Sequence, residues 1–170
     1  MFARSMYSGM MKLVNATDNL YLSPAEQQQF LAYTNSLPRR FAAARQVEAK
    51  EAEIVEQCHA QLRRLYPTFE NFHKDGWDKS YRDTQIVLRY NVQAMLMDDA
   101  EVANDKLFGW LRTLLAGLDL TPRLVRDTFT SLREACRVKL PADAFTLLEP
   151  HLDRTIDVLS DFTEPAMAAV

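Results

Sequence analysis

Cys58 and Cys136 are the two residues of this sequence with the greatest capacity for covalent chemistry. A cysteine reacts or binds metal as its thiolate, and a metal site needs further cysteines or histidines at short spacing. Apart from the adjacent His59, no such residue stands near either cysteine. We therefore expect two reduced thiols that behave as small apolar side chains.

The remaining polar residues form no arrangement typical of catalysis. The three histidines are His59, His73 and His151. None belongs to a metal motif, and the sequence has no glycine-rich phosphate loop and no readable Ser-His-Asp pattern. Asp98 and Asp99 carry like charges on adjacent residues, which we expect to be solvated. The sequence therefore predicts neither an enzyme nor a metal site.

Arg82 and Asp83 place opposite charges on adjacent residues, three positions after Lys79. An acidic side chain in the first turn of a helix is favoured by the helix dipole without any ligand. From these residues alone, we expect a solvated helix start.

Composition limits the elements that could position these residues. The chain has 170 residues, enough for one domain with a sizeable core, and only four glycines, too few for many tight turns. A net charge of -3 argues against nucleic-acid binding. No apolar run is long enough to span a bilayer, and Met1–Leu13 does not resemble a signal peptide, so we expect a cytoplasmic protein.

Hydrophobic spacing and capping residues predict an all-helical chain. Ser23, Pro24 and Glu26 are typical of a helix start. We expect this helix to end at Leu37–Pro38, a loop to occupy Thr68–Lys79, and other helices to cover Ser5–Val14, Arg39–Tyr66, Ser80–Asp98, Glu101–Ala116, Thr121–Val138 and Pro141–Leu159.

The order of several motifs resembles that of phycobiliprotein subunits. Arg82-Asp83, four residues and then Leu88-Arg89-Tyr90 match the family's central helix. Thr121-Pro122 and Pro141-Ala142-Asp143 resemble later helix starts of the same family. The resemblance implies an all-α, globin-like (phycobiliprotein-type) fold with an N-terminal helical hairpin. It divides the chain into a hairpin (1–37), a globin-like domain (38–163) and a flexible tail (164–170).

Two departures from the family pattern concern pigment attachment. The family's main attachment cysteine stands two residues before the Arg-Asp pair, where this sequence has Ser80. The second attachment position of β-type subunits corresponds to Ala144. A thioether to a bilin requires a thiolate, which neither residue provides. We therefore expect no covalent cofactor.

The resemblance also implies how a bilin, such as a phycocyanobilin-like pigment, could bind without a covalent bond. Asp83 would accept hydrogen bonds from the pyrrole nitrogens, and Arg82 would pair with a propionate. Lys79 could add a cation, and Tyr81 could lie against the tetrapyrrole plane. The expected contact residues are Asp83, Arg82, Lys79, Tyr81, Ser80 and Tyr90.

Aromatic residues could line the same pocket, although we expect most of them to lie in the core or at an interface. They are Trp77, Trp110, Phe69, Phe72 and Phe108. Haem is not expected, because no histidine lies between Glu101 and Val138, where a proximal ligand would stand.

The methionine-rich apolar residues of Ser5–Val14 lead us to expect a homodimer through residues 5–37. Packing of the same face within one chain is the alternative.

These features predict an accessory protein of bilin biosynthesis, bilin delivery or phycobilisome assembly, which contacts the proteins of those processes. Two other interpretations stay open. One is a structural or regulatory module of the antenna without pigment. The other is a sensory globin that binds a different small molecule.

Overall fold

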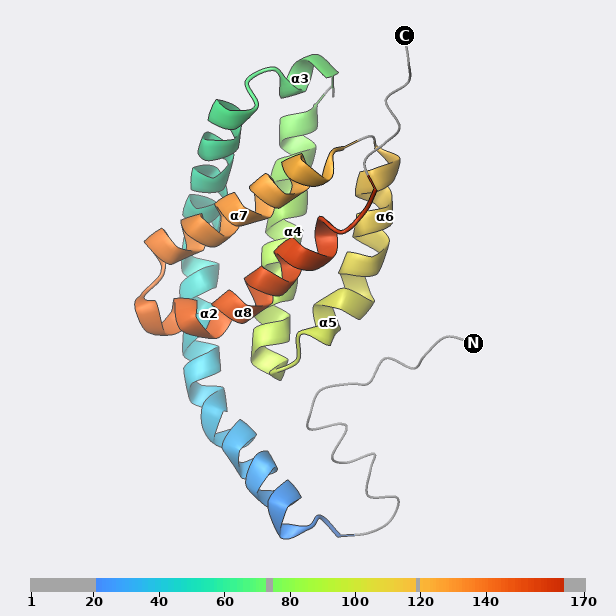
Figure 1. Cartoon of the computed structure of the whole chain (residues 1–170). Coiled ribbons are helices and arrows are strands. Elements are labelled where there is room, and N and C mark those ends of the chain that lie inside the picture. The colour runs from blue at the N-terminus through green and yellow to red at the C-terminus, as the bar shows by residue number, and fades with distance from the viewer. Residues whose placement is uncertain (1–20, 73–74, 119, 164–170) are drawn as a thin grey trace.

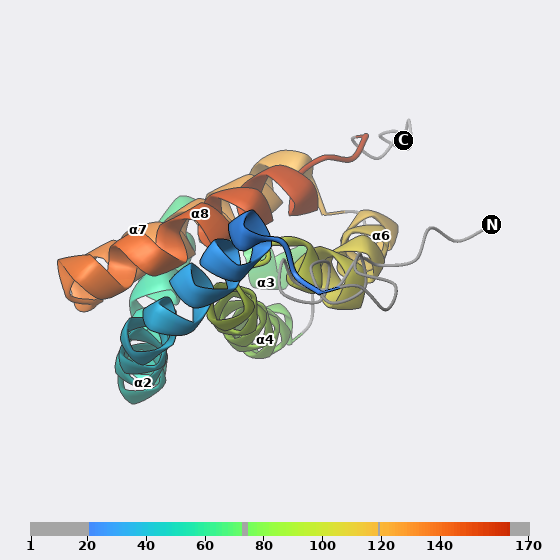
Figure 2. The ribbon, with the colours of Figure 1, turned by 90° about the horizontal axis from the view of Figure 1, so that it is seen from below.

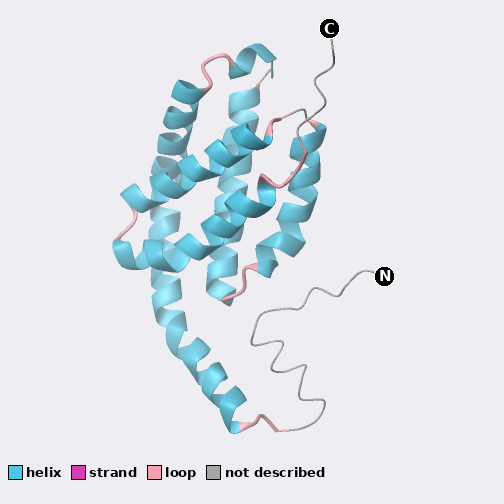
Figure 3. Cartoon of the chain, in the orientation of Figure 1, coloured by secondary structure: helices cyan, strands magenta, loops and turns pink. Residues whose placement is uncertain are grey.

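The computed structural model describes residues 21–72, 75–118 and 120–163, which form helices and loops without any strand (Figure 3). The elements in chain order are α2 (Pro24–Leu65), α3 (Phe69–Phe72), α4 (Gly76–Met97), α5 (Glu101–Ala103), the π-helical turn η1 (Asn104–Phe108), α6 (Gly109–Gly117), α7 (Pro122–Lys139) and α8 (Ala142–Leu159). The predicted all-α fold is confirmed.

Helix α2 begins where the capping residues predicted. The Ser23 backbone N–H donates to Glu26 Oε2 at 2.7 Å, and the Glu26 N–H donates to Ser23 Oγ at 3.4 Å. These reciprocal bonds satisfy two backbone donors at the helix start. The helix then continues for 42 residues. At 1.5 Å per residue its length is roughly 63 Å.

The break predicted at Leu37–Pro38 is wrong, because α2 passes through Pro38 without interruption. A proline inside a helix removes one backbone hydrogen bond and bends the axis without necessarily ending the helix, and Pro38 is exposed. The axis of α2 changes direction between its blue and cyan parts (Figure 1). The proposed boundary after residue 37 therefore falls inside one helix. Residues 1–20 of the predicted hairpin lie outside the described ranges.

The first part of α2 forms an arm, Pro24–Arg39, that projects from the body (Figure 1). No residue of the arm is buried, and the first buried residue of α2 is Arg40. Figure 2 shows the arm from its free end. At its base, the Tyr33 hydroxyl donates to the Leu96 carbonyl at 3.1 Å, which joins the arm to the end of α4.

The body packs α2 against α4, α7 and α8 around one apolar core. Helix α4 contributes residues with no exposed surface on three successive turns, which are Val87, Leu88, Asn91, Ala94 and Met95. Helices α7 and α8 lie side by side across α2 and α4 in both views (Figures 1 and 2). Helix α4 is therefore central, as expected for a helix that is apolar around much of its circumference.

Most of the loop predicted at Thr68–Lys79 is helical. Helix α3 covers Phe69–Phe72, and α4 begins at Gly76 instead of Ser80. Asp75, immediately before α4, has a left-handed backbone with φ of 56°. Aspartate is one of the few residues besides glycine that tolerate this conformation. Gly76 permitted a loop, but its burial in the body favours a helix.

The helix predicted over Glu101–Ala116 is present but irregular. It contains the π-helical turn η1, and α6 continues it to Gly117. Helix α7 starts as predicted, since Thr121 Oγ1 accepts the Leu124 N–H at 3.1 Å. The residues around this start form one wall of the cavity described below.

None of the helices in the described ranges combines the length and apolar character needed to cross a bilayer.

Candidate functional site

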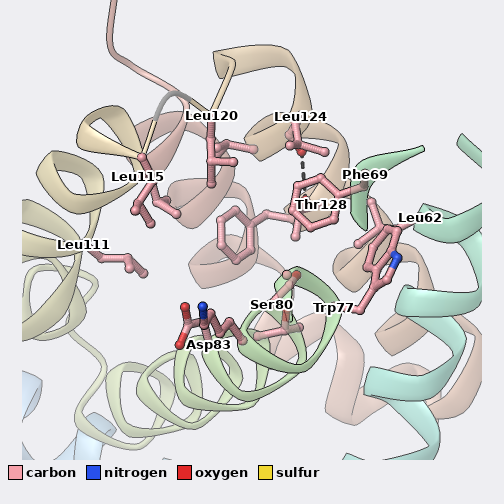
Figure 4. Close-up of a pocket in the computed structure, with 16 residues that line it drawn as sticks. Leu62, Phe69, Trp77, Ser80, Asp83, Leu111, Leu115, Leu120, Leu124 and Thr128 are labelled. Carbon is pink, nitrogen blue, oxygen red and sulfur yellow. Dashed lines mark hydrogen bonds between the residues drawn. The ribbon is translucent and has the colours of Figure 1, made fainter. Parts of the chain in front are cut away.

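A cavity of about 400 Å³ lies between the first turns of α4, helix α6 and the start of α7 (Figure 4). The ends of α2 and α3 close it with Leu62 and Phe69. Small-molecule sites in proteins occupy about 300–1,000 Å³ and are mainly apolar with a few polar groups. The size of this cavity is therefore suited to an organic ligand.

The polar side of the cavity belongs mainly to α4. Lys79, Ser80, Asp83 and Thr84 line it. Residues three and four positions apart share one face of a helix, so two turns of α4 bring these four side chains to the same wall. Figure 4 shows Ser80 and Asp83 on this side. Because α4 lies in the centre of the body, its backbone holds these groups in place.

The opposite wall is apolar and comes from α6, α7 and the loop between them. Its residues are Leu111, Leu115, Leu118, Leu120, Leu124, Val125 and Phe129. Figure 4 shows Leu115 and Leu120 across the cavity from Asp83. A ligand held here would have one edge against polar groups and the other against leucines. Such a site selects a molecule that is apolar over most of its surface.

Asp83 forms an ion pair with Arg82 at the edge of the cavity. Asp83 Oδ1 accepts from Arg82 Nη2 at 3.2 Å and from Arg82 Nε at 3.3 Å. The Arg82 side chain is 68% exposed, and the Asp83 side chain is 33% exposed. Pairs this open to water add little to stability, so a ligand could compete for either group at small cost.

The structure brings four of the six predicted site residues together. Lys79, Ser80 and Asp83 line the cavity, and Arg82 joins them through Asp83. Thr84 was not predicted, although its position one residue after Asp83 could have indicated it.

Tyr81 and Tyr90 do not line the cavity, which corrects their expected placement. Tyr81 follows Ser80 by about 100° around α4, and its ring lies 5.2 Å from the His59 ring. Tyr90 shares the angular position of Asp83 but stands seven residues further along. At 1.5 Å per residue this is roughly 10 Å, and Tyr90 instead packs against the core.

Of the predicted aromatic residues, some line the cavity and others do not. Trp77 and Phe69 line the cavity, with ring centroids 4.8 Å apart. Phe108 belongs to the core, and Trp110 is 65% exposed. The Phe72 side chain lies outside the described part of the structure. The leucine wall was not predicted, because an i, i+4 leucine pattern does not distinguish a core face from a cavity face.

Both cysteines are buried, and neither is among the residues that line the cavity. Burial raises the pKa of the Cys58 thiol, and that of the Cys136 thiol, to about 12. The thiolate needed for a thioether is therefore disfavoured at both residues. Ala144, at the second attachment position of the resemblance, is 1% exposed in α8 and lies in the core.

Comparison with known proteins defines the class of this fold and site. The family model for phycobilisome proteins matches residues 12–159, so the chain belongs to the phycobilisome protein family. The helical architecture is consistent with the globin-like fold that the sequence predicted. A search of curated proteins finds no match.

Proposed function

We propose that this chain is a phycobilisome accessory protein that holds a bilin without a covalent bond and assists bilin biosynthesis, delivery or antenna assembly. One observation carries this proposal. A cavity of about 400 Å³ keeps acidic and basic groups at its polar wall and places Ser80 where the resemblance would have a cysteine. On this proposal the protein acts in the cytoplasm and is not an enzyme.

The lining residues fit the chemistry of a bilin, whose ring nitrogens can donate hydrogen bonds and share a positive charge. The Asp83 carboxylate is a charge-assisted acceptor for such donors. Lys79 and Arg82 are cations at the same wall, suited to propionate groups. The leucines opposite would exclude water from the apolar face of the pigment. Because Ser80 offers a hydroxyl in place of a thiolate, binding would stay reversible.

We also propose a homodimer through the N-terminal helices, and the arm of α2 supports it. Tyr21 and Leu31 are 100% and 58% exposed, and no side chain of Pro24–Arg39 is buried. Apolar side chains on an extended helix gain most from covering each other in a second copy. The same surface could contact phycobilisome components or bilin-handling proteins.

A structural or regulatory module without pigment is the second candidate function. The ion pair of Asp83 with Arg82 favours it, because the carboxylate already has a partner in the unliganded chain. The aromatic rings of Trp77 and Phe69 line one end of the cavity. A sensory globin that binds another apolar molecule would use the same cavity.

Titration with phycocyanobilin, followed by absorption spectroscopy, tests the proposal. We expect a saturable spectral change and complete loss of pigment in acidic urea. Asp83→Asn should weaken binding about ten- to a hundredfold, since bonds to charged groups contribute about 1.5–3 kcal/mol. Asp78→Asn is the control, because Asp78 is exposed on α4 and is not among the lining residues. No spectral change at tens of micromolar pigment would favour the structural module.

A further inference from the structure

His59 lies directly behind the polar wall of the cavity. It belongs to α2, has no exposed surface and packs against three residues of α4. Its Nε2 is 3.4 Å from Thr84 Oγ1. Its ring meets Trp77 edge-on at 6.0 Å and Tyr81 at 5.2 Å. The imidazole therefore connects α2 to the turns of α4 that carry the cavity residues.

Two of these three contacts are residues that line the cavity, Trp77 and Thr84. Trp77 is held from α2 at a second point, because the Arg63 guanidinium lies 5.7 Å from its ring. His59 and Arg63 are four residues apart, so they project from the same face of α2. A change in the charge or position of His59 must therefore alter this wall.

The surroundings of His59 favour the neutral imidazole. Burial lowers the pKa of His59, and the Arg63 charge lowers it further. The charge of Glu56 and a hydrogen bond with the Ser80 backbone act in the opposite direction and raise the pKa of His59. The Tyr81 phenol ring of α4 also lies beside the imidazole. His59 Nδ1 is buried without a hydrogen-bond partner. A protonated ring would leave this second N–H unsatisfied and would place two cations beside Trp77.

We propose that His59 is a positioning residue for the cavity: the neutral ring holds Trp77 and Thr84 in the ligand-binding arrangement, and its protonation releases the ligand. This inference rests on the proposed function only in requiring that the cavity binds a ligand. It adds regulation of that site by pH: the ligand binds at pH values above the pKa of His59 and is released at pH values below it.

The test measures ligand affinity between pH 5 and pH 8 in a Trp110→Phe background. The sequence has two tryptophans, so this background leaves Trp77 as the single tryptophan, which can be excited selectively. The probe is 1-anilinonaphthalene-8-sulfonate, whose sulfonate stays ionised over this range, with phycocyanobilin in a parallel series. If only the neutral form binds, affinity should fall about tenfold for each pH unit below the pKa of His59.

His59→Gln removes the titrating ring and its packing, so it should weaken binding and leave an affinity that no longer depends on pH. Its matched control is His151→Gln. The pKa of His151 is also lowered by burial, but His151 lies on α8 near Arg40, Asp98 and Asp99, and not among the cavity residues. The control should therefore keep the slope of the parent protein. The inference would be overturned if the affinity of His59→Gln depended on pH as steeply as that of the parent protein. It would also be overturned if the affinity of the parent protein did not change with pH.

A second measurement tests the inference even if His59→Gln does not fold or the probe does not bind. The emission of Trp77 in the parent background should change with the same midpoint as the NMR signal of His59. Different midpoints would refute the coupling. If the sulfonate probe follows pH and phycocyanobilin never binds, the positioning role stands and the proposed bilin function fails.

Discussion

Ser80 has a hydroxyl oxygen where a cysteine would have a sulfur, and this one atom decides whether a thioether to a pigment can form. The residue lines the cavity beside Asp83, on the wall where a bound pigment would meet α4. A serine hydroxyl is a far weaker nucleophile than a thiolate at neutral pH. The cavity could therefore hold the same pigment with or without a bond, depending on this side chain alone.

Ser80→Cys should convert reversible binding into covalent attachment. The experiment co-expresses the variant with bilin-synthesising and bilin-attaching proteins and asks whether colour survives acidic urea. Ala144→Cys is the matched control, because Ala144 is 1% exposed in the core and its thiol would not reach the cavity. We expect denaturation-resistant colour in Ser80→Cys alone. Resistant colour in the unmodified protein would contradict our assignment of Ser80.

At the scale of the elements, Arg40 fixes the arm to the body. Its side chain is 10% exposed and its Nη2 lies 2.7 Å from Asp98 Oδ1. Its Nε donates to Ser36 Oγ at 2.8 Å, and its Nη1 donates to the Met95 carbonyl. A cation at the last carbonyls of α4 also complements the dipole of that helix. Arg40 and the Tyr33 hydroxyl, which donates to the Leu96 carbonyl, together hold the bent helix α2 against the end of α4.

Arg40→Met should lower the free energy of unfolding by about 2 kcal/mol, because it removes charge-assisted bonds from a buried site. The neighbouring Arg39→Met changes the same chemistry on the exposed side of α2 and should cost less than about 0.5 kcal/mol. Urea denaturation followed by circular dichroism measures both. Equal losses would show that the bonds of Arg40 contribute nothing beyond its aliphatic stem.

At the scale of the whole molecule, the arm carries an exposed leucine on a helix that projects from the body. The body buries its own core around α4, whereas Leu31 is 58% exposed on the arm. In the homodimer that we propose, this leucine would be covered by the second copy.

Sedimentation velocity at micromolar concentration should therefore detect a dimer, and Leu31→Glu should shift it towards monomer. Leu65→Glu provides the comparison, because Leu65 is 53% exposed at the opposite end of the same helix. Both changes are at exposed positions and should leave the helical content unchanged. A monomeric parent protein would exclude the dimer, and equal effects of the two variants would place the contact elsewhere.

The sequence by itself determined the helical class, the family and three of the four residues at the polar wall of the cavity, which are Lys79, Ser80 and Asp83. Capping residues such as Ser23 and Thr121 act on backbone groups within one turn, so their effect can be read locally. The positions of Ser80 and Asp83 on one helix face follow from the helical repeat in the same way.

Only the tertiary structure decided which residues oppose that wall and which stand behind it. Leu115 and Leu120 face Asp83 because α6 and α7 pack there, and no local pattern distinguishes a cavity from a filled core. The continuity of α2 across Pro38 likewise depends on exposure, which the sequence does not state. His59 acquires its significance from contacts with residues of another helix, and such contacts exist only once the chain has folded.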